Sequence, residues 1–147
     1  MPVRLGKISE RDLALNTDDL LKKLKKYKGV EVFKNFDLTR KSSAGIKSCA
    51  DLYIKIKDEN STVDVVNKLA ELKLNYLILG KGSNIILPER MTDPVIQLSF
   101  NLPESEFWIA NDSYWLPANI PINIMTGKAI KLGLKGWEVF TGIPATL

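Results

Sequence analysis

An alternating run of apolar residues is the feature that most restricts what this chain can fold into. Leu52, Ile54 and Ile56 recur at every second position, with polar or aromatic residues between them, and this period of two predicts a β-strand. A helical pattern follows over residues 61–73, and residues 76–79 form a short apolar run that predicts another strand. A strand, a helix and a strand within this short stretch of sequence predict one βαβ unit.

Two helices are predicted before and within this unit. Thr17 is a suitable N-cap for the first helix, and Gly29 is a natural end for it. The second helix should begin with the capping-box-like segment at residues 61–64. The expected apolar face of the first helix is Leu20, Leu21, Leu24 and Tyr27, and the stripe of the second is Val63, Val66, Leu69, Ala70 and Lys73.

A third helix and several short strands are predicted in the rest of the chain. Pro121 fits the first turn of a helix, because its missing N–H costs nothing there. The apolar face of this helix would hold Ile122, Met125, Ala129 and Leu132, and the glycine after this face would end it. Strands are expected at residues 85–87, 95–98, 107–109 and 114–116.

The residue types in the chain exclude several classes of function. The 147 residues include no histidine, which removes Ser-His-Asp and Cys-His catalysis and the commonest neutral metal ligand. We therefore expect no metal site, and we assign no catalytic residue. The net charge is +4, with five lysines within residues 22–28. Since no interleaved series of aromatic residues and no known motif accompany these lysines, a solvated helix face is favoured and nucleic acid is not an expected partner.

Cysteine content and hydropathy bear on the cellular location. Cys49 is the single cysteine, so the chain can form no internal disulfide, as is usual in a reducing compartment. The N-terminal residues have no apolar signal core, and no apolar run is long enough to span a membrane. These features predict a cytoplasmic protein with no membrane partner.

The segment that follows the second predicted strand carries most of the functional information. Gly80 and Gly82 flank Lys81, and Ser83 and Asn84 come next. A diphosphate needs several converging donors, and backbone N–H groups supply them where glycines bend the chain tightly. The order differs from a Walker loop, and the expected strand at 85–87 replaces the helix of a Rossmann fingerprint. The residues of this loop leave two interpretations open, a phosphate-binding loop and a glycine-rich turn without a ligand.

Three separated segments together resemble a known family. Residues 79–84 (LGKGSN) look like the diphosphate-binding loop of the UDP-N-acetylenolpyruvoylglucosamine reductases, the MurB family of flavoenzymes in peptidoglycan synthesis. Residues 43–52 (SAGIKSCADL) are similar to the family segment that leads into the first strand of the FAD domain. Residues 133–146 (GLKGWEVFTGIPAT) resemble the segment that ends in Gly-Ile-Pro-Gly-Thr. The order and intervening lengths fit as well.

This resemblance implies FAD as the cofactor and assigns residues to it. Ile46 would lie near the flavin or ribityl end, although core packing is the alternative role for it and for Ile143. The residues implied to hold the diphosphate are Gly80, Lys81, Gly82, Ser83 and Asn84, and those implied to close over the isoalloxazine are Gly142, Ile143, Pro144 and Ala145.

The resemblance also implies a fold class and a domain division. The fold would be α+β, an FAD-binding domain of the MurB and vanillyl-alcohol-oxidase type with mixed sheets and flanking helices. Residues 1–34 would be a helical appendage, and residues 35–147 an FAD-binding domain that is incomplete relative to the family. Ala145 stands where the family often has glycine, and Lys47-Ser48 replaces what is often a glycine pair. Both departures are expected to weaken FAD binding more than the fold.

The family implies that parts of the reductase lie outside this sequence. An active-site arginine, a serine proton donor and a glutamate come after the Gly-Ile-Pro-Gly-Thr segment in the family, so unaided turnover is not expected. Uncovered sheet edges and apolar faces would favour a homodimer or a partner protein. Three hypotheses follow: a minimal FAD-binding module, part of an NADPH-dependent reductase, and an interaction module that kept the fold without the cofactor.

Overall fold

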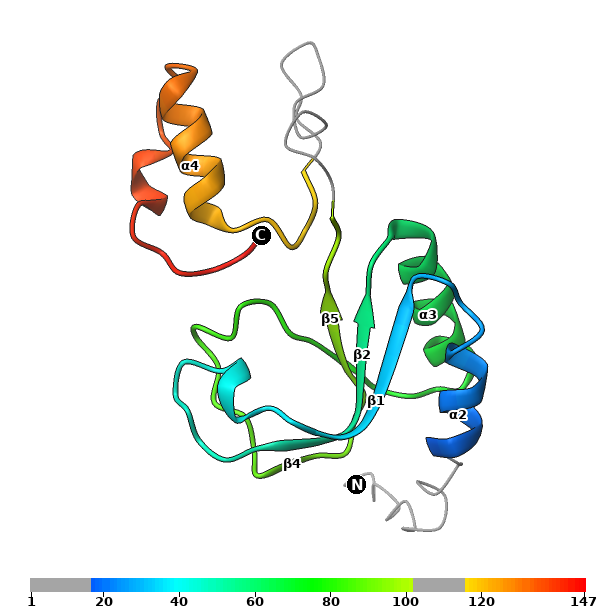
Figure 1. Cartoon of the computed structure of the whole chain (residues 1–147). Coiled ribbons are helices and arrows are strands. Elements are labelled where there is room, and N and C mark those ends of the chain that lie inside the picture. Colours follow the sequence, from blue (N-terminus) through cyan, green and yellow to red (C-terminus); the bar gives the residue numbers. More distant parts are fainter. Residues whose placement is uncertain (1–16, 102–115) are drawn as a thin grey trace, which may run out of the picture.

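The computed structural model describes residues 17–101 and 116–147 and shows a mixed sheet with two helices on one face (Figure 1). The strand predicted at 107–109, and all but the last residue of the one predicted at 114–116, lie outside this part of the chain. The elements are α2 (Thr17–Leu24), β1 (Val30–Asp37), η1 (Thr39–Lys41), β2 (Cys49–Ile56), α3 (Glu59–Glu71), β3 (Leu77–Ile78), β4 (Arg90–Met91), β5 (Val95–Leu98), α4 (Ile122–Lys131) and η3 (Glu138–Phe140).

The sheet confirms the predicted βαβ unit and adds a strand inside it. The strand order is β1-β2-β5-β3, and β4 pairs with β2. β1 runs antiparallel to β2, whereas β5 is parallel to both β2 and β3. The predicted α+β class with a mixed sheet is therefore confirmed. Because β2, β5 and β3 are parallel, their carboxyl ends meet at one edge of the sheet.

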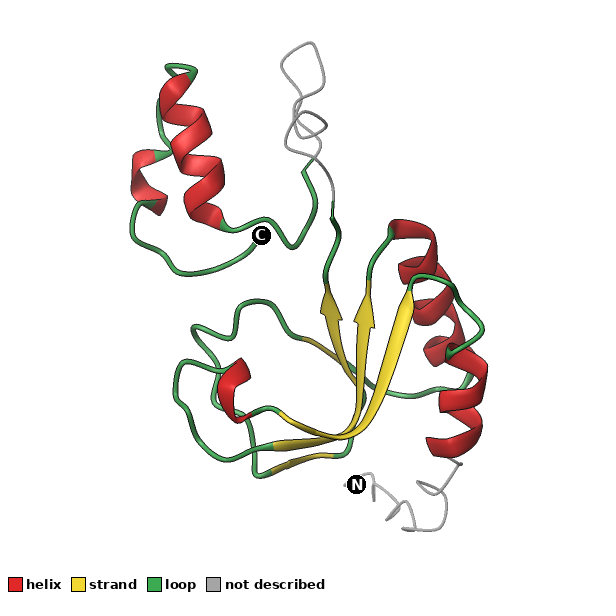
Figure 2. Cartoon of the chain, in the orientation of Figure 1, coloured by secondary structure: helices red, strands yellow, loops and turns green. Residues whose placement is uncertain are grey.

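The main hydrophobic core lies between the sheet and the helices α2 and α3 (Figure 2). It contains the residues of β2 whose alternation predicted the strand, Leu52, Ile54 and Ile56, all of which are buried. Leu20 and Leu24 of α2 pack there as predicted, with Leu21 and Tyr27 partly buried beside them. The predicted boundary at residue 34 falls within β1, and the division into an appendage and a domain remains a prediction.

A smaller apolar cluster covers the opposite face of the sheet. Tyr53 and Val95 point into it from β2 and β5, and Leu38, Leu79 and Leu87 reach it from loops. The β2 strand is thus buried on both faces, because helices cover one side and loops the other (Figure 1).

The start and the face of α3 differ from the prediction. The N-cap is Asp58, whose Oδ1 accepts a hydrogen bond of 2.7 Å from the Ser61 N–H. The helix therefore begins before the predicted capping box at 61–64. The face that packs against the sheet holds Ser61, Val65 and Leu69, and Val63 of the predicted stripe is 54% exposed.

Gly29 has a different role from the predicted helix end. The α2 helix ends at Leu24, well before this glycine. A Cβ on Gly29 would lie 1.6 Å from Asp58 Oδ2. The position therefore accommodates the N-cap of α3, a contact between segments distant in sequence.

The strand predicted at residues 85–87 is wrong, whereas β5 has the predicted bounds. Leu87 is buried in the smaller cluster, but Ile86 is 76% exposed and the segment pairs with no described strand. β-branched residues favour a strand only where a partner edge is available, and here the short β4 at Arg90–Met91 takes the place beside β2.

The α4 helix ends as predicted, but it begins directly after Pro121, which was predicted to lie within its first turn. Pro121 is its N-cap, and Gly133, at φ +70°, follows its C-cap. The Leu134 N–H donates to the Ala129 carbonyl and the Gly133 N–H to the Ile130 carbonyl, which is the Schellman pattern. Met125 and Ala129 are buried as expected, but Leu132 is half exposed.

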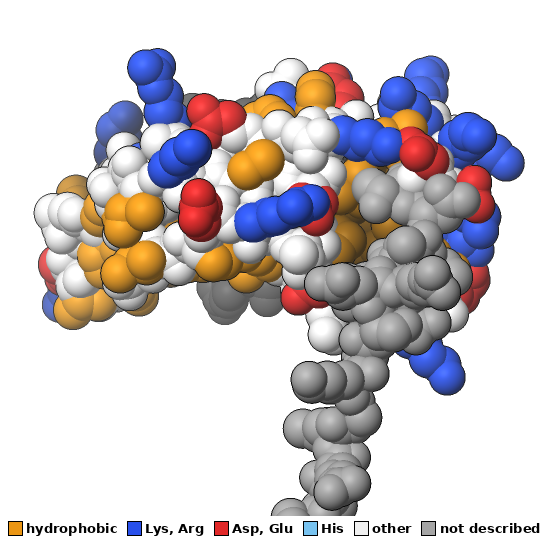
Figure 3. Space-filling view, turned by 90° about the horizontal axis from the view of Figure 1, so that it is seen from below, with side chains coloured by type: hydrophobic (Ala, Val, Ile, Leu, Met, Phe, Trp, Pro, Cys, Tyr) orange, Lys and Arg blue, Asp and Glu red, His pale blue; other side chains and the backbone are white. Residues whose placement is uncertain are grey.

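The surface of the described residues is mixed in character. On the face that Figure 3 shows, acidic and basic side chains are interspersed with hydrophobic ones. None of the helices in the described ranges is long and apolar enough to cross a bilayer. Ile130, Leu132 and Val139 are more than half exposed on the C-terminal part, and the homodimer or partner contact remains a prediction.

The α3 helix ends in a Schellman motif with lysine at the left-handed position, which generates a stability prediction. Lys73 has φ +53°, and the Leu74 N–H donates to the Leu69 carbonyl. Because a non-glycine residue is strained there, Lys73→Gly should raise the free energy of unfolding by about 1 kcal/mol. The matched control Lys68→Gly, inside the same helix, should lower it by about 1 kcal/mol. Urea denaturation measures the free energy of unfolding of both variants. If Lys73→Gly lowers it as Lys68→Gly does, Lys73 is not strained.

Candidate functional site

The loop at residues 80–84 is held against the segment that follows η1. Gly82 is buried at φ +70°, and a Cβ there would lie 1.8 Å from the Lys41 carbonyl oxygen. The Gly82 carbonyl in turn accepts a hydrogen bond of 2.8 Å from the Ser43 N–H. Only glycine satisfies both the positive φ and the close backbone approach, so this position sets the shape of the loop.

The amides of this loop are available to a ligand. Within the described ranges, the backbone N–H groups of residues 80–84 donate no hydrogen bond. Among these residues Gly82 is buried and Ser83 is partly buried, and an amide at such a position usually has a partner, whereas Gly80, Lys81 and Asn84 are exposed. A loop of this kind at the end of a strand is a typical anion-binding arrangement.

The three segments that carry the resemblance converge on this loop. Ser43 contacts Gly82 through the hydrogen bond above, and the Thr146 Oγ1 lies 2.7 Å from where a Gly80 Cβ would stand. The chain returns to this place because the Ile122 N–H donates to the Ala145 carbonyl and the Leu147 N–H to the Ile120 carbonyl. A shallow cavity of about 220 Å³ results, lined by residues 78–85 and 145–147.

A larger cavity of about 770 Å³ adjoins the loop at the carboxyl ends of the parallel strands. Lys55 of β2 and Gln97 of β5 line it, together with Phe33 and Phe36 of β1. The two cavities share residues 78–81, 146 and 147. Ligands of open α/β sheets commonly bind outside the carboxyl ends of strands, and this volume falls within the range of small-molecule sites.

A hydrogen-bonded group of side chains connects the sheet to the loop. The Tyr53 hydroxyl and the Lys41 ammonium both donate to Gln97 Oε1, the latter at 2.9 Å. Gln97 Nε2 donates to the Gly80 carbonyl at 3.4 Å. Tyr53 stacks on Phe36 with ring centroids 4.0 Å apart. Burial raises the pKa of the Tyr53 hydroxyl to about 12, so it is a hydrogen-bond donor and not a base at neutral pH.

The comparisons with known proteins find partial similarity to curated sequences and to a solved structure. No family model matches the chain. A UDP-N-acetylenolpyruvoylglucosamine reductase from Clostridioides difficile is 33% identical over 100 residues, which are 67% of this chain and 32% of that protein. One from Carboxydothermus hydrogenoformans is 26% identical over 116 residues, 79% of this chain and 38% of the relative.

The chain is similar to part of UDP-N-acetylenolpyruvoylglucosamine reductase. It spans about a third of the length of the curated relatives that it matches. The crystal structure of the reductase MurB from Thermus caldophilus superposes with a TM-score of 0.56 at 24% identity, over 80% of this chain and 39% of that one. At this identity the superposition supports the fold.

The residues predicted from the MurB resemblance are only partly brought together. Gly80, Lys81, Gly82, Ser83, Asn84 and Ala145 all line the small cavity. Ile46 is 50% exposed and Ile143 is 41% exposed, and neither they nor Gly142 and Pro144 line the cavities around the loop. A flavin contact for these four residues remains a prediction.

Several side chains at the site were not predicted as site residues, among them Lys41, Tyr53, Gln97 and Thr146. Tyr53 and Gln97 lie on predicted strands, but only the register of β2 against β5, which pairs Tyr53 with Val95 and Lys55 with Gln97, brings them within hydrogen-bonding reach. Lys41 lies 56 residues from Gln97 in sequence. Of these four residues, only Thr146 could have been found from the sequence, because it belongs to the third MurB-like segment.

The two positions that depart from the MurB pattern have clear roles here. Ser48 is buried, its Oγ donates to the Pro88 carbonyl at 2.7 Å, and its carbonyl accepts from the Leu38 N–H. It thereby joins the loop segment to the start of β2. Ala145 contributes its carbonyl to the Ile122 N–H at the start of α4. Ser48 therefore fixes the chain at the start of β2, whereas Ala145 lines the small cavity and holds the C-terminal segment to α4 through its backbone.

Two glycine substitutions in the loop should differ in their effect. Gly82→Ala places a Cβ against the Lys41 backbone at positive φ, so we expect a loss of about 3 kcal/mol of unfolding free energy. In Gly80→Ala the new Cβ meets only the Thr146 hydroxyl, which can rotate away, so the loss should stay below about 1 kcal/mol. Urea denaturation compares the two, and equal losses would contradict the close approach at Gly82.

The Tyr53 hydroxyl should lose its proton only at high pH. Its pKa is raised from 10.0 to about 12 in the folded protein, so its contribution to stability is complete below pH 10 and is lost as the pH rises from 10 to 12. A spectrophotometric titration of phenolate absorbance should show a step near pH 12 that is absent in Tyr53→Phe. If the substitution instead removes absorbance near pH 10, the hydroxyl is not desolvated.

Proposed function

We propose that this chain binds FAD, with the diphosphate on the amides of residues 80–84. The observation that supports this most directly is the set of five loop N–H groups that donate to no described residue. The MurB-like sequence of the loop and the convergence of three MurB-like segments around it support the same assignment.

The residues at the site fit the chemistry of a dinucleotide. Gly82 keeps the loop free of a Cβ that would collide with the chain beneath it. Ser83 and Asn84 line the small cavity and offer a hydroxyl and an amide in addition to the backbone donors. The larger cavity, with Phe33, Phe36 and the Tyr53 ring in its wall, offers apolar surface for an organic ring system.

The roles of the chain's own residues in this proposal are binding and orientation. FAD, when bound, supplies hydride-transfer chemistry that side chains lack. The loop would hold the diphosphate, and the four predicted residues Ile46, Gly142, Ile143 and Pro144 would approach the flavin end. Gln97 holds the loop to the sheet by its bond to the Gly80 carbonyl.

The reductase reaction as a whole belongs to the longer relatives. They are named for the reduction of UDP-N-acetylenolpyruvoylglucosamine, and this chain matches about a third of their length. A reduction of that kind needs a placed proton donor as well as hydride. We expect FAD binding by this chain, and no NADPH oxidation with the enolpyruvyl sugar nucleotide by the chain alone.

Added FAD should raise the thermal stability of the purified chain and acquire a protein-bound flavin spectrum. A ligand that binds only the folded state stabilises it, by about 2.7 kcal/mol at a hundred times the dissociation constant. Asn84→Ala removes a loop side chain and should weaken FAD about fivefold, in line with one lost hydrogen bond. Asn67→Ala, an exposed position on α3, is the matched control and should leave the affinity unchanged.

The outcome that contradicts the proposal is a colourless protein whose unfolding temperature does not change with excess FAD. Under that result the third hypothesis, an interaction module with the same fold, would be the better description. Equal losses of affinity in Asn84→Ala and Asn67→Ala would place the binding site away from the loop.

A further inference from the structure

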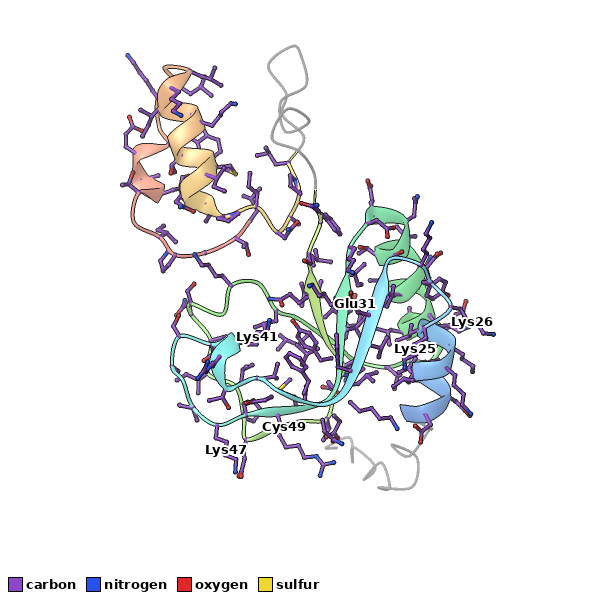
Figure 4. The ribbon with its side chains drawn as sticks, viewed as in Figure 1. Lys25, Lys26, Glu31, Lys41, Lys47 and Cys49 are labelled. Atoms are coloured by element: carbon purple, nitrogen blue, oxygen red, sulfur yellow. The ribbon has the colours of Figure 1, made fainter. Side chains whose placement is uncertain are left out.

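Lys41 carries a half-buried positive charge at the junction of the loop and the large cavity. Its ammonium donates to Gln97 Oε1 at 2.9 Å and lies 5.4 Å from the centroid of the Tyr53 ring and 5.7 Å from that of Phe36. Burial, and secondarily the charge of Lys55, lower the pKa of this ammonium. The Lys41 side chain extends from η1 on the side of the sheet away from α2 and α3 (Figure 4).

This charge has no carboxylate partner in the described part of the chain. The ion pairs found there engage Lys34, Lys55, Lys57, Lys68 and Arg90, and none engages Lys41. Glu31 lines the same cavity but is paired with Lys57 and Lys55. A partly desolvated cation without a counter-ion is costly, and a bound anion would offset that cost.

Two contacts place Lys41 beside the loop amides. Its backbone carbonyl lies beneath Gly82, and its ammonium shares Gln97 with the Gly80 carbonyl. The loop and the cation therefore belong to one site, although they are far apart in sequence. Lys81, the lysine inside the loop, is exposed and forms no ion pair with a described residue.

We infer that Lys41 is the specificity-determining cation for a diphosphate ester at this site, pairing with the anionic charge while the amides of residues 80–84 donate hydrogen bonds to the oxygens. The choice of a flavin diphosphate rests on the proposed function. The pairing of Lys41 with a diphosphate does not depend on it, because the charge and the amides recognise the anion and not the organic group.

The test compares ligands that share an organic group and differ in the diphosphate. FAD and riboflavin share the flavin, and ADP and adenosine share the adenosine. In calorimetric titrations, Lys41→Met should weaken FAD and ADP about tenfold, in line with a lost charge-assisted contact, and should leave riboflavin and adenosine unchanged. Lys41→Arg keeps the charge and should stay within about threefold of the parent protein.

Lys26→Met is the matched control for the loss of one positive charge. Lys26 is exposed and lies near α2, on the other side of the sheet (Figure 4). The Lys26→Met variant should bind FAD and ADP with the same affinity as the parent protein. The unfolding midpoint of Lys41→Met without ligand should stay close to that of the parent protein, because the loss of the hydrogen bond to Gln97 is offset by the removal of a partly buried charge that has no carboxylate partner among the described residues.

The possible outcomes separate this inference from the proposed function. If the parent protein binds FAD and Lys41→Met binds it equally well, or loses FAD and riboflavin by the same factor, the inference is overturned and the flavin function stands. If the parent protein binds ADP or inorganic pyrophosphate through Lys41 but does not bind FAD, the inference stands and the flavin function fails. Binding of no phosphate ligand overturns both.

Discussion

The contact between Gly82 and the backbone of Lys41 is the constraint on which the rest of the site depends. A positive φ and the absence of a Cβ let two loops from different parts of the chain approach at backbone distance. The Ser43 N–H then donates to the Gly82 carbonyl, and the backbone N–H groups of residues 80–84 donate to no described residue. The same approach brings the Lys41 side chain to the loop, so one glycine determines both the donors and the charge of the site.

The insertion of β5 into the βαβ unit decides what surrounds the loop. Because β5 lies between β2 and β3, Gln97 stands between Tyr53 of β2 and Gly80 after β3. Its carbonyl oxygen accepts from two donors and its amide nitrogen holds the loop. The cavity at the carboxyl ends of the strands therefore combines aromatic surface, a charge without a carboxylate partner in the described part of the chain, and free backbone donors, as a nucleotide site requires.

The local sequence pattern predicted which segments are helices and strands better than it predicted which of their residues are buried. The β2 strand, the β5 strand, the α4 caps and the helical nature of α2 and α3 followed from periodicity and capping residues. The start of α3 was missed because Asp58, and not the Ser61 segment, caps the helix, and its buried face was missed because packing against the sheet selects Val65 among the neighbouring valines. The run at 85–87 was assigned to a strand because its β-branched residues fit one, but a strand also needs a neighbour, and β4 occupies the place beside β2.

The sequence by itself determined that a strand, a helix and a strand lead into a glycine-bent loop, and it pointed to the MurB-like segments that surround this loop. The tertiary structure alone decided that Lys41, Tyr53 and Gln97 belong to the same site, to which Thr146 of the third MurB-like segment also contributes. The physical reason is that alternation and capping act between neighbours in sequence, whereas a cavity is made by strand order and by the closure of loops over distances that no local pattern encodes.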